Sequence, residues 1–451
     1  MQLMFSFKRQ RFSTSGFLVG LSRRWICSQR GRTVMSFGDG SHGALGLPMP
    51  IVGLGSDVYE PTPISGLPCD VTSIAAGHFH SIAVTREGHV YSWGRNTEAQ
   101  LGRHHLSPRE KWNEPKRVEG LDKVRVRSAF ASGVVSAALA EDGSLWVWGT
   151  SKNGQLGLGE GLKKAVLPSR VETLAGEHIV KASFGWGHAL AMSASGKLFG
   201  WGYYADGRIG KMGKELEISP LEEYKSPRLR SPEKTFISAE EAAEQSVFEA
   251  IEKEKDMPVI WKPGLVEELL GVTVEDIACG LDHSLVVCSD GTLLSGGSNA
   301  YGQLGRTSQD LGLHPVDIGG FRASSVASGL GHSLAVCEDP SSGPKVFSWG
   351  WNQSCQLGRQ CPAAALGHIP LQVEGLEGGT PKLVSAGRAH SLVVTTKNEV
   401  WAWGCGKNGR LGLCSSADEA EPMLVDFCQD FELLEAVAGL DHTLVLGEIV
   451  C

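Results

Sequence analysis

The amino-acid sequence predicts an all-β fold, a seven-bladed β-propeller that is closed by its N- and C-terminal strands and carries one largely helical insertion. Three observations lead to this prediction: a tryptophan segment that recurs seven times, a histidine segment that recurs seven times, and an incomplete repeat at each end of the chain. Glycine contributes 58 of the 451 residues, an excess that recurring tight turns would explain.

The first repeated segment is a Trp-Gly followed, eight residues after the tryptophan, by a Leu-Gly or Ile-Gly. Its closing glycines are 56, 55, 53, 95, 53 and 54 residues apart, so one step alone is irregular. Phe37 and Gly296 replace the tryptophan in two copies. The other five copies contain Trp93, Trp148, Trp201, Trp349 and Trp403. Such a period is the signature of a repeat architecture.

The second repeated segment has the form Gly-x-x-His-Ser followed by alternating apolar residues. Its histidines are His80, His188, His283, His332, His390 and His442. In the remaining copy, counted from Gly133, Ser136 occupies the histidine position. After a turn such as Glu87-Gly88 the chain resumes as the tryptophan segment, so each pair of segments predicts a β-hairpin.

The repeats, each a small antiparallel sheet, must stack on their neighbours to bury their faces, which favours a closed propeller over residues 33–447. The expected repeats are about 33–86, 88–141, 143–194, 196–288, 290–338, 344–395 and 397–446. The chain starts with a lone tryptophan-type strand, residues 34–38, and ends with a lone histidine-type strand, residues 439–446. Pairing these two strands would complete the seventh blade and remove two open sheet edges.

These segments resemble those of the regulator of chromosome condensation repeat family, whose units carry the same Gly-x-x-His-Ser and Trp-Gly-x-Asn-x-x-Gly-Gln-Leu-Gly motifs. The resemblance covers residues 33–447 and implies a seven-bladed propeller. It says less about function, because propellers host many unrelated activities.

The irregular step of 95 residues indicates a charged, partly helical insertion at 211–262, within the fourth repeat. A capping-box pattern at residues 238–241 predicts a helix from Ala239 to about Lys255. Its apolar stripe, Val247, Phe248 and Ile251, is a candidate partner-binding surface or a contact with the propeller.

The N-terminal residues 1–32 have the composition of a mitochondrial transit peptide, with a chloroplast transit peptide or a retained, nucleic-acid-binding basic tail of a nuclear protein as alternatives. Seven basic residues and several serines precede Asp39, the first acidic residue. Without this leader the formal net charge falls from -8 to about -15. No segment is apolar enough to span a membrane.

The side chains that suggest chemistry favour a structural role. Propeller symmetry spreads the six histidines around a ring, so we expect each buried imidazole to form its hydrogen bonds within its own blade and the tryptophans to pack there. The eleven cysteines contain no CxxC pair, and the Gly-rich segment 38–43 lacks the βαβ unit of a dinucleotide site. We therefore predict no catalytic residue, no metal and no cofactor.

The family resemblance implies three kinds of function: guanine-nucleotide exchange, ultraviolet-B photoreception, or scaffolding in organelles. The photoreceptor's tryptophan cluster is missing, since one tryptophan, Trp186, stands at the matching positions. The leader is mitochondrial in character, and the sequence resembles plant mitochondrial members linked to intron splicing and complex I accumulation. We therefore expect a non-enzymatic matrix scaffold that binds protein partners and reaches RNA through them. Exchange activity on a small GTPase and mitochondrial ribosome assembly are the alternatives.

Overall fold

The computed structural model describes residues 31–48, 57–104, 111–204, 206–212, 258–308, 310–339, 341, 343–359, 367–376, 379–427 and 431–449. Residues 1–30, most of the insertion and its predicted helix, with Val247, Phe248 and Ile251, lie outside this part of the chain.

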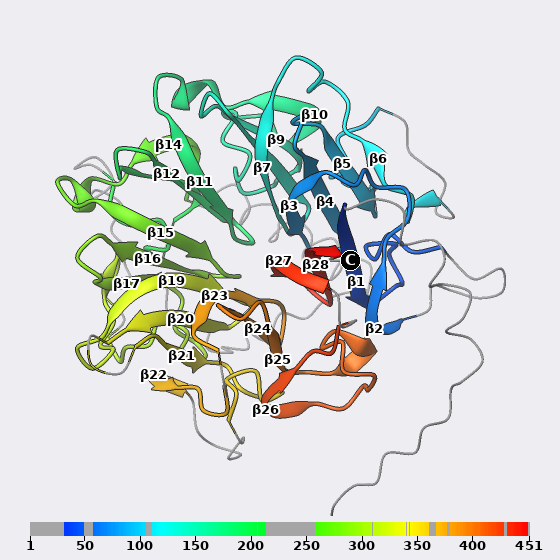
Figure 1. The fold of residues 1–451 in the computed structure, drawn as a ribbon. Coiled ribbons are helices and arrows are strands. Elements are labelled where there is room, and N and C mark those ends of the chain that lie inside the picture. Colours follow the sequence, from blue (N-terminus) through cyan, green and yellow to red (C-terminus); the bar gives the residue numbers. More distant parts are fainter. Residues whose placement is uncertain are drawn as a thin grey trace, which may run out of the picture.

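The described residues form seven four-stranded antiparallel sheets arranged in a ring, which confirms the predicted seven-bladed propeller (Figure 1). Blade 1 consists of β3 (Val71–Ala76), β4 (His80–Thr85), β5 (Val90–Gly94) and β6 (Lys116–Arg117). Blade 2 consists of β7 (Val126–Ser132), β8 (Val135–Ala140), β9 (Leu145–Thr150) and β10 (Lys164–Arg170). Blade 3 consists of β11 (Ile179–Phe184), β12 (His188–Ser193), β13 (Leu198–Tyr203) and β14 (Val259–Leu265). Blade 4 consists of β15 (Val274–Cys279), β16 (His283–Cys288), β17 (Leu293–Gly297) and β18 (His314–Pro315). Blade 5 consists of β19 (Arg322–Ser328), β20 (His332–Glu338), β21 (Lys345–Gly350) and β22 (Gly367–Gln372). Blade 6 consists of β23 (Pro381–Ala386), β24 (His390–Thr395), β25 (Val400–Gly404) and β26 (Glu419–Leu424). Three short 3-10 turns complete the described elements: η2 (Glu172–Leu174), η4 (Glu267–Leu269) and η5 (Lys407–Gly409).

Blade 7 joins the two ends of the chain, as predicted. It contains β1 (Arg32–Gly38), β2 (Val58–Pro63), β27 (Phe431–Ala438) and β28 (His442–Ile449), in the order β2-β1-β28-β27. Arg32, the last residue of the predicted leader, begins β1 and pairs with Glu448 of β28 at 2.8 Å. The ring therefore closes through hydrogen bonds between the first and last strands.

The sequence repeats are offset from the blades. Each repeat spans the outer two strands of one blade and the inner two strands of the next, so the repeated motifs face one another across the seams between blades. The end of the predicted insertion, residues 259–262, begins β14 and pairs with β13 of blade 3.

Each repeat tryptophan locks its blade to the preceding one. The Trp93 indole donates a hydrogen bond of 2.8 Å to the Ala44 carbonyl in the β1–β2 loop of blade 7. The next-but-one residue, Gly46, is required there, because a Cβ at this position would lie 2.9 Å from the Trp93 indole nitrogen. The Leu-Gly motif of one blade thus fits the tryptophan of the next. The same bond joins Trp148, Trp201, Trp349 and Trp403 to Gln100, Gln155, Gln303 and Gln356.

The six repeat histidines also act across the seams, so the prediction of bonds within each blade was wrong. The Nε2 atom of His80 lies 2.8 Å from the Ser136 hydroxyl of blade 2. Equivalent bonds join His188, His283, His332, His390 and His442 to Ser284, Ser333, Ser391, Thr443 and Ser81 of the next blade. The reason is the strand order, which places each imidazole at the seam rather than inside its own sheet.

The direction of this bond fixes the histidine tautomer. The Ser136 hydroxyl donates to the Gln100 carbonyl at 2.7 Å, so it must accept from the His80 Nε2–H. Nδ1 then carries a bare lone pair, and in five of the six histidines it has no hydrogen-bond partner in the described structure. Burial lowers the pKa of His80 and His283 to about 3 and that of His332 and His442 to about 4. The rings are therefore neutral in the folded protein.

The seam between blades 2 and 3 lacks this bond. The predicted histidine position in blade 2, Ser136, was wrong by one residue. Strand pairing places Val135, not Ser136, at the histidine position, and Ser136 at the hydroxyl position. The Val135 side chain meets blade 3, where Ala189 replaces the hydroxyl, and both belong to one apolar cluster. Donor and acceptor are thus missing together at the seam between blades 2 and 3.

The glycine of the histidine motif is missing from the same blade. A Cβ at Gly77 would lie 2.4 Å from the His80 ring, so glycine makes room for the imidazole. In blade 2 the equivalent residue is Ser132, which is tolerated because Val135 has no ring there. The motif is therefore one packing unit of glycine, imidazole and hydroxyl.

We expect Val135→His alone to destabilise the protein by about 1–3 kcal/mol, because its ring would meet the Ser132 Cβ and find no acceptor at Ala189. The triple variant Ser132→Gly, Val135→His, Ala189→Ser should recover most of that loss. Urea unfolding measures both. Equal stability of the single and triple variants would contradict the packing unit.

Stability should fall as the pH drops from about 6.5 to 4. The unfolded histidines bind protons in this range while the folded ones stay neutral, so each removes about 1.4 kcal/mol of stability per pH unit. Glu435, whose pKa is raised to about 7, has the opposite effect, because the folded protein binds its proton in this range. This single group opposes the six repeat histidines. His332→Gln should reduce the pH dependence of the unfolding free energy, obtained from urea unfolding, by the equivalent of about one bound proton. An unchanged pH dependence would contradict this assignment.

The closing strands offer a third test. Leu444 of β28 is fully buried, so Leu444→Ala should cost about 2–5 kcal/mol of unfolding free energy. Glu448→Ala, on the same strand, removes a half-exposed ion pair and should cost less than about 1 kcal/mol. Urea unfolding of the two variants compares packing with ion pairing at the closure, and equal losses would argue against closure by packing.

Candidate functional site

The propeller presents two faces, which the strand ends define. The loop face carries the turns before β4 and its equivalents together with the long loops after the tryptophan strands. The turn face carries the hairpins after the histidine strands and the connections between blades. The predicted histidines and tryptophans are buried in the seams and reach neither face, so they hold the scaffold rather than a ligand.

Trp186 is the most exposed aromatic side chain of the loop face among the described residues, with 54% of its surface accessible. It follows β11 of blade 3, and its ring stacks on His78 of blade 1 at 5.4 Å with an interplanar angle of 18°. Gly133 occupies the equivalent position in the turn of blade 2, between blades 1 and 3. Because glycine has no side chain, the two rings can meet across this turn. Burial lowers the pKa of His78 to about 4, so a neutral imidazole supports the indole.

Arginine replaces glutamine in the two loops that face a blade without a tryptophan. Arg208 of blade 3 binds Asp282 of blade 4, where Gly296 stands at the tryptophan position. Arg410 of blade 6 binds Asp441 of blade 7, in which Phe37 occupies the tryptophan position. Ion pairs on the loop face thus substitute for the missing indole bond at these seams.

Among the described residues, the loops and turns with an excess of negative charge lie on the turn face. Connections between strand ends on this face contain sixteen acidic and five basic described residues, whereas those at the opposite strand ends contain ten and twelve. The acidic residues are Asp70, Glu87, Glu119, Asp122, Glu141, Asp142, Glu172, Glu177, Glu267, Glu268, Asp290, Asp317, Asp339, Glu374, Glu399 and Asp426. The turn face therefore attracts cations and repels phosphates.

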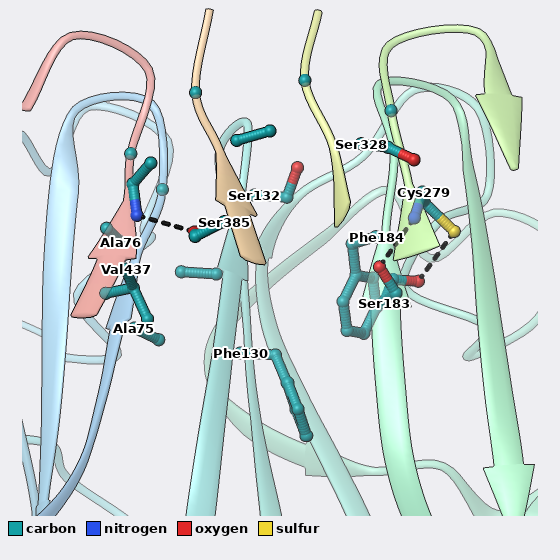
Figure 2. Close-up of a pocket in the computed structure, with 18 of the residues that line it drawn as sticks. Ala75, Ala76, Phe130, Ser132, Ser183, Phe184, Cys279, Ser328, Ser385 and Val437 are labelled. Atoms are coloured by element: carbon teal, nitrogen blue, oxygen red, sulfur yellow. Dashed lines mark hydrogen bonds between the residues drawn. The ribbon is translucent and has the colours of Figure 1, made fainter. Parts of the chain in front are cut away.

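The inner strands of all seven blades line a central cavity of about 430 Å³, the channel of the propeller. Its wall consists largely of alanine, serine and glycine. Figure 2 shows two contacts that join neighbouring inner strands: the Ser183 hydroxyl accepts the Cys279 amide, and the Ser385 hydroxyl accepts the Ala438 amide, each at 2.9 Å.

One layer of residues on the inner strands contains three ionisable side chains, of which Lys181 and Glu435 line the channel. Every inner strand has a bulge at its second, third or fourth residue, and the residue after each bulge occupies an equivalent position. These seven residues are Ser73, Ser128, Lys181, Asp276, Ser325, Leu383 and Glu435. Sequence reasoning missed this layer, because its polar members look like ordinary positions in an alternating strand.

The described residues contain no group of three or more side chains suited to hold a metal ion. Among them, too, no helix is long and apolar enough to cross a lipid bilayer.

Comparison with known proteins identifies relatives over most of the chain. It is 28% identical to the ultraviolet-B receptor UVR8 of Arabidopsis thaliana over 405 residues, covering 88% of this chain and 67% of the receptor. It is 25% identical to the mitochondrial RCC1 domain-containing protein RUG3 of the same plant over 389 residues, covering 83% and 64%. It spans only 6% of the mouse E3 ubiquitin-protein ligase HERC2, at 29% identity over 80% of this chain.

Solved structures share the fold. Prp20p of Saccharomyces cerevisiae superposes with a TM-score of 0.72 at 22% identity, covering 94% of this chain and 93% of that one. Human WBSCR16 gives the same TM-score at 21% identity, covering 93% and 99%. A model of the RCC1-like domain matches residues 33–445, and the chain therefore belongs to the RCC1-like domain family.

Proposed function

We propose that this protein is a non-enzymatic interaction scaffold of the mitochondrial matrix whose loop face binds protein partners. The observation that carries the proposal is the exposed Trp186, held in place by its stack on His78 at the centre of that face. Tryptophan is among the residue types that dominate the binding energy of protein interfaces. A rigid, exposed indole suits recognition of another protein.

The mitochondrial location has two supports. The N-terminal segment is rich in arginine and serine and has no acidic residue before Asp39. The relative RUG3 is a mitochondrial protein by its name and matches 83% of this chain. Together they favour import into the matrix.

The partners we propose belong to an organelle RNA-processing assembly that supports intron splicing and, through it, the accumulation of complex I. The body without its leader carries a formal charge of about -15, and its turn face is acidic. Direct phosphate binding requires basic residues, so RNA would be reached through the bound proteins.

Affinity capture of the tagged full chain from isolated mitochondria tests this proposal. We expect splicing proteins together with intron-containing transcripts, and Trp186→Ala should reduce their recovery at least fivefold. The matched control is Ile369→Ala, which removes a 64% exposed side chain from the outer strand β22 and should leave recovery unchanged.

Other outcomes would replace the proposal. Recovery of a small GTPase that is released by added nucleotide would indicate an exchange factor. Recovery of ribosomal assembly proteins without introns would indicate the ribosomal alternative. Equal recovery by the Trp186 and Ile369 variants would exclude Trp186 as the anchor.

A further inference from the structure

Two carboxylates occupy equivalent positions in the channel layer, and their surroundings differ. Asp276 of β15 accepts the amide of Val326 in the next blade at 3.0 Å and its neighbour Ile277 at 2.9 Å. Glu435 of β27 likewise accepts the amide of the next blade, from Ile74 at 3.1 Å. Each carboxylate therefore bridges two inner strands in the same way.

The difference lies in the cation. Lys181, the equivalent residue of the blade before Asp276, places its ammonium group on the Asp276 carboxylate. The equivalent residue of the blade before Glu435 is Leu383. Among the described residues, no cation pairs with Glu435.

We propose that Glu435 is the receptor for a primary ammonium group that enters the channel from the turn face and takes the position that Lys181 holds at Asp276. The ligand class is an alkylamine, supplied either by a free polyamine or by a lysine side chain of a partner. The inference is independent of the scaffold function proposed above.

Access and charge support this site. Glu435 and Leu383 lie in the half of the channel nearer the turn face, and Leu383 keeps 40% of its surface exposed. The sixteen acidic residues of the turn face draw cations toward that face. A cavity of about 430 Å³ admits an extended alkylamine.

The ionisation of Glu435 fits a carboxyl that lacks its counterion. Burial raises its pKa to about 7, and the Ile74 amide opposes this effect only in part. An ammonium group would stabilise the charged carboxylate, as an opposite charge does at short range.

Isothermal titration of the full chain with putrescine at 0.15 M salt tests the site. We expect saturable binding to one site that Glu435→Gln weakens at least tenfold, since the amide oxygen still accepts the Ile74 amide but carries no charge. The matched control Glu172→Gln removes one charge from the same face outside the channel and should change the affinity less than twofold. Equal binding by the wild type and Glu435→Gln, or no saturable binding of any amine, would overturn the proposal.

A second variant supplies the missing cation from within. Leu383→Lys reproduces the Lys181 arrangement and should abolish amine binding while raising the melting temperature. The same substitution in the Glu435→Gln background should give no such rise, which a general effect of added lysine would not predict. An equal rise in both backgrounds would count against pairing with Glu435.

The source of the amine is resolved by the probe. Binding of putrescine without binding of a capped single-lysine peptide assigns the site to free polyamines. The reverse result assigns it to a partner's lysine.

Discussion

At four of the seven seams, a single backbone carbonyl organises the contact between blades. At Gln100, Gln303, Gln356 and Ala44 this oxygen accepts both the indole of the next blade and its seam hydroxyl, and the hydroxyl in turn accepts the imidazole of the preceding blade. Two side chains thus satisfy the buried carbonyl, and the hydroxyl of one of them links it to an imidazole of the preceding blade. Buried polar groups tolerate little deviation once paired, so this chain of bonds fixes how neighbouring blades sit against each other.

The variations among the seams follow the same logic. Where the imidazole is replaced by Val135, the hydroxyl is replaced by Ala189, and an apolar contact takes over. Where the indole is absent, Arg208 or Arg410 replaces the usual glutamine and binds an aspartate across the seam. Blade 3, from which the insertion departs, is bordered by one seam of each kind, so its neighbours hold it by different chemistry from the rest of the ring.

The sequence was sufficient to predict the number of blades and their closure, because the tryptophan and histidine segments recur at a steady spacing. It could not reveal that the histidines bond across seams, since spacing along the chain does not say which neighbouring sheet a side chain faces. The register of blade 2 was missed because Gly133 lies one residue from the position that glycine holds elsewhere. Glu435 and Lys181 were missed for a related reason: only the ring brings seven distant strand positions into one layer. Trp186 was noted in the sequence, but its exposure depends on the turns around it.

The closure of blade 7 also bears on how the protein reaches its folded state. The inner neighbour of β1 is β28, the C-terminal described strand, and the two strands pair along the whole length of β1. Synthesis from the N-terminus delivers β28 last. The first strand therefore keeps one edge unpaired until the C-terminal strand is available. An unpaired strand edge is open to association with other chains, so the folding chain is exposed to this hazard until its two ends meet.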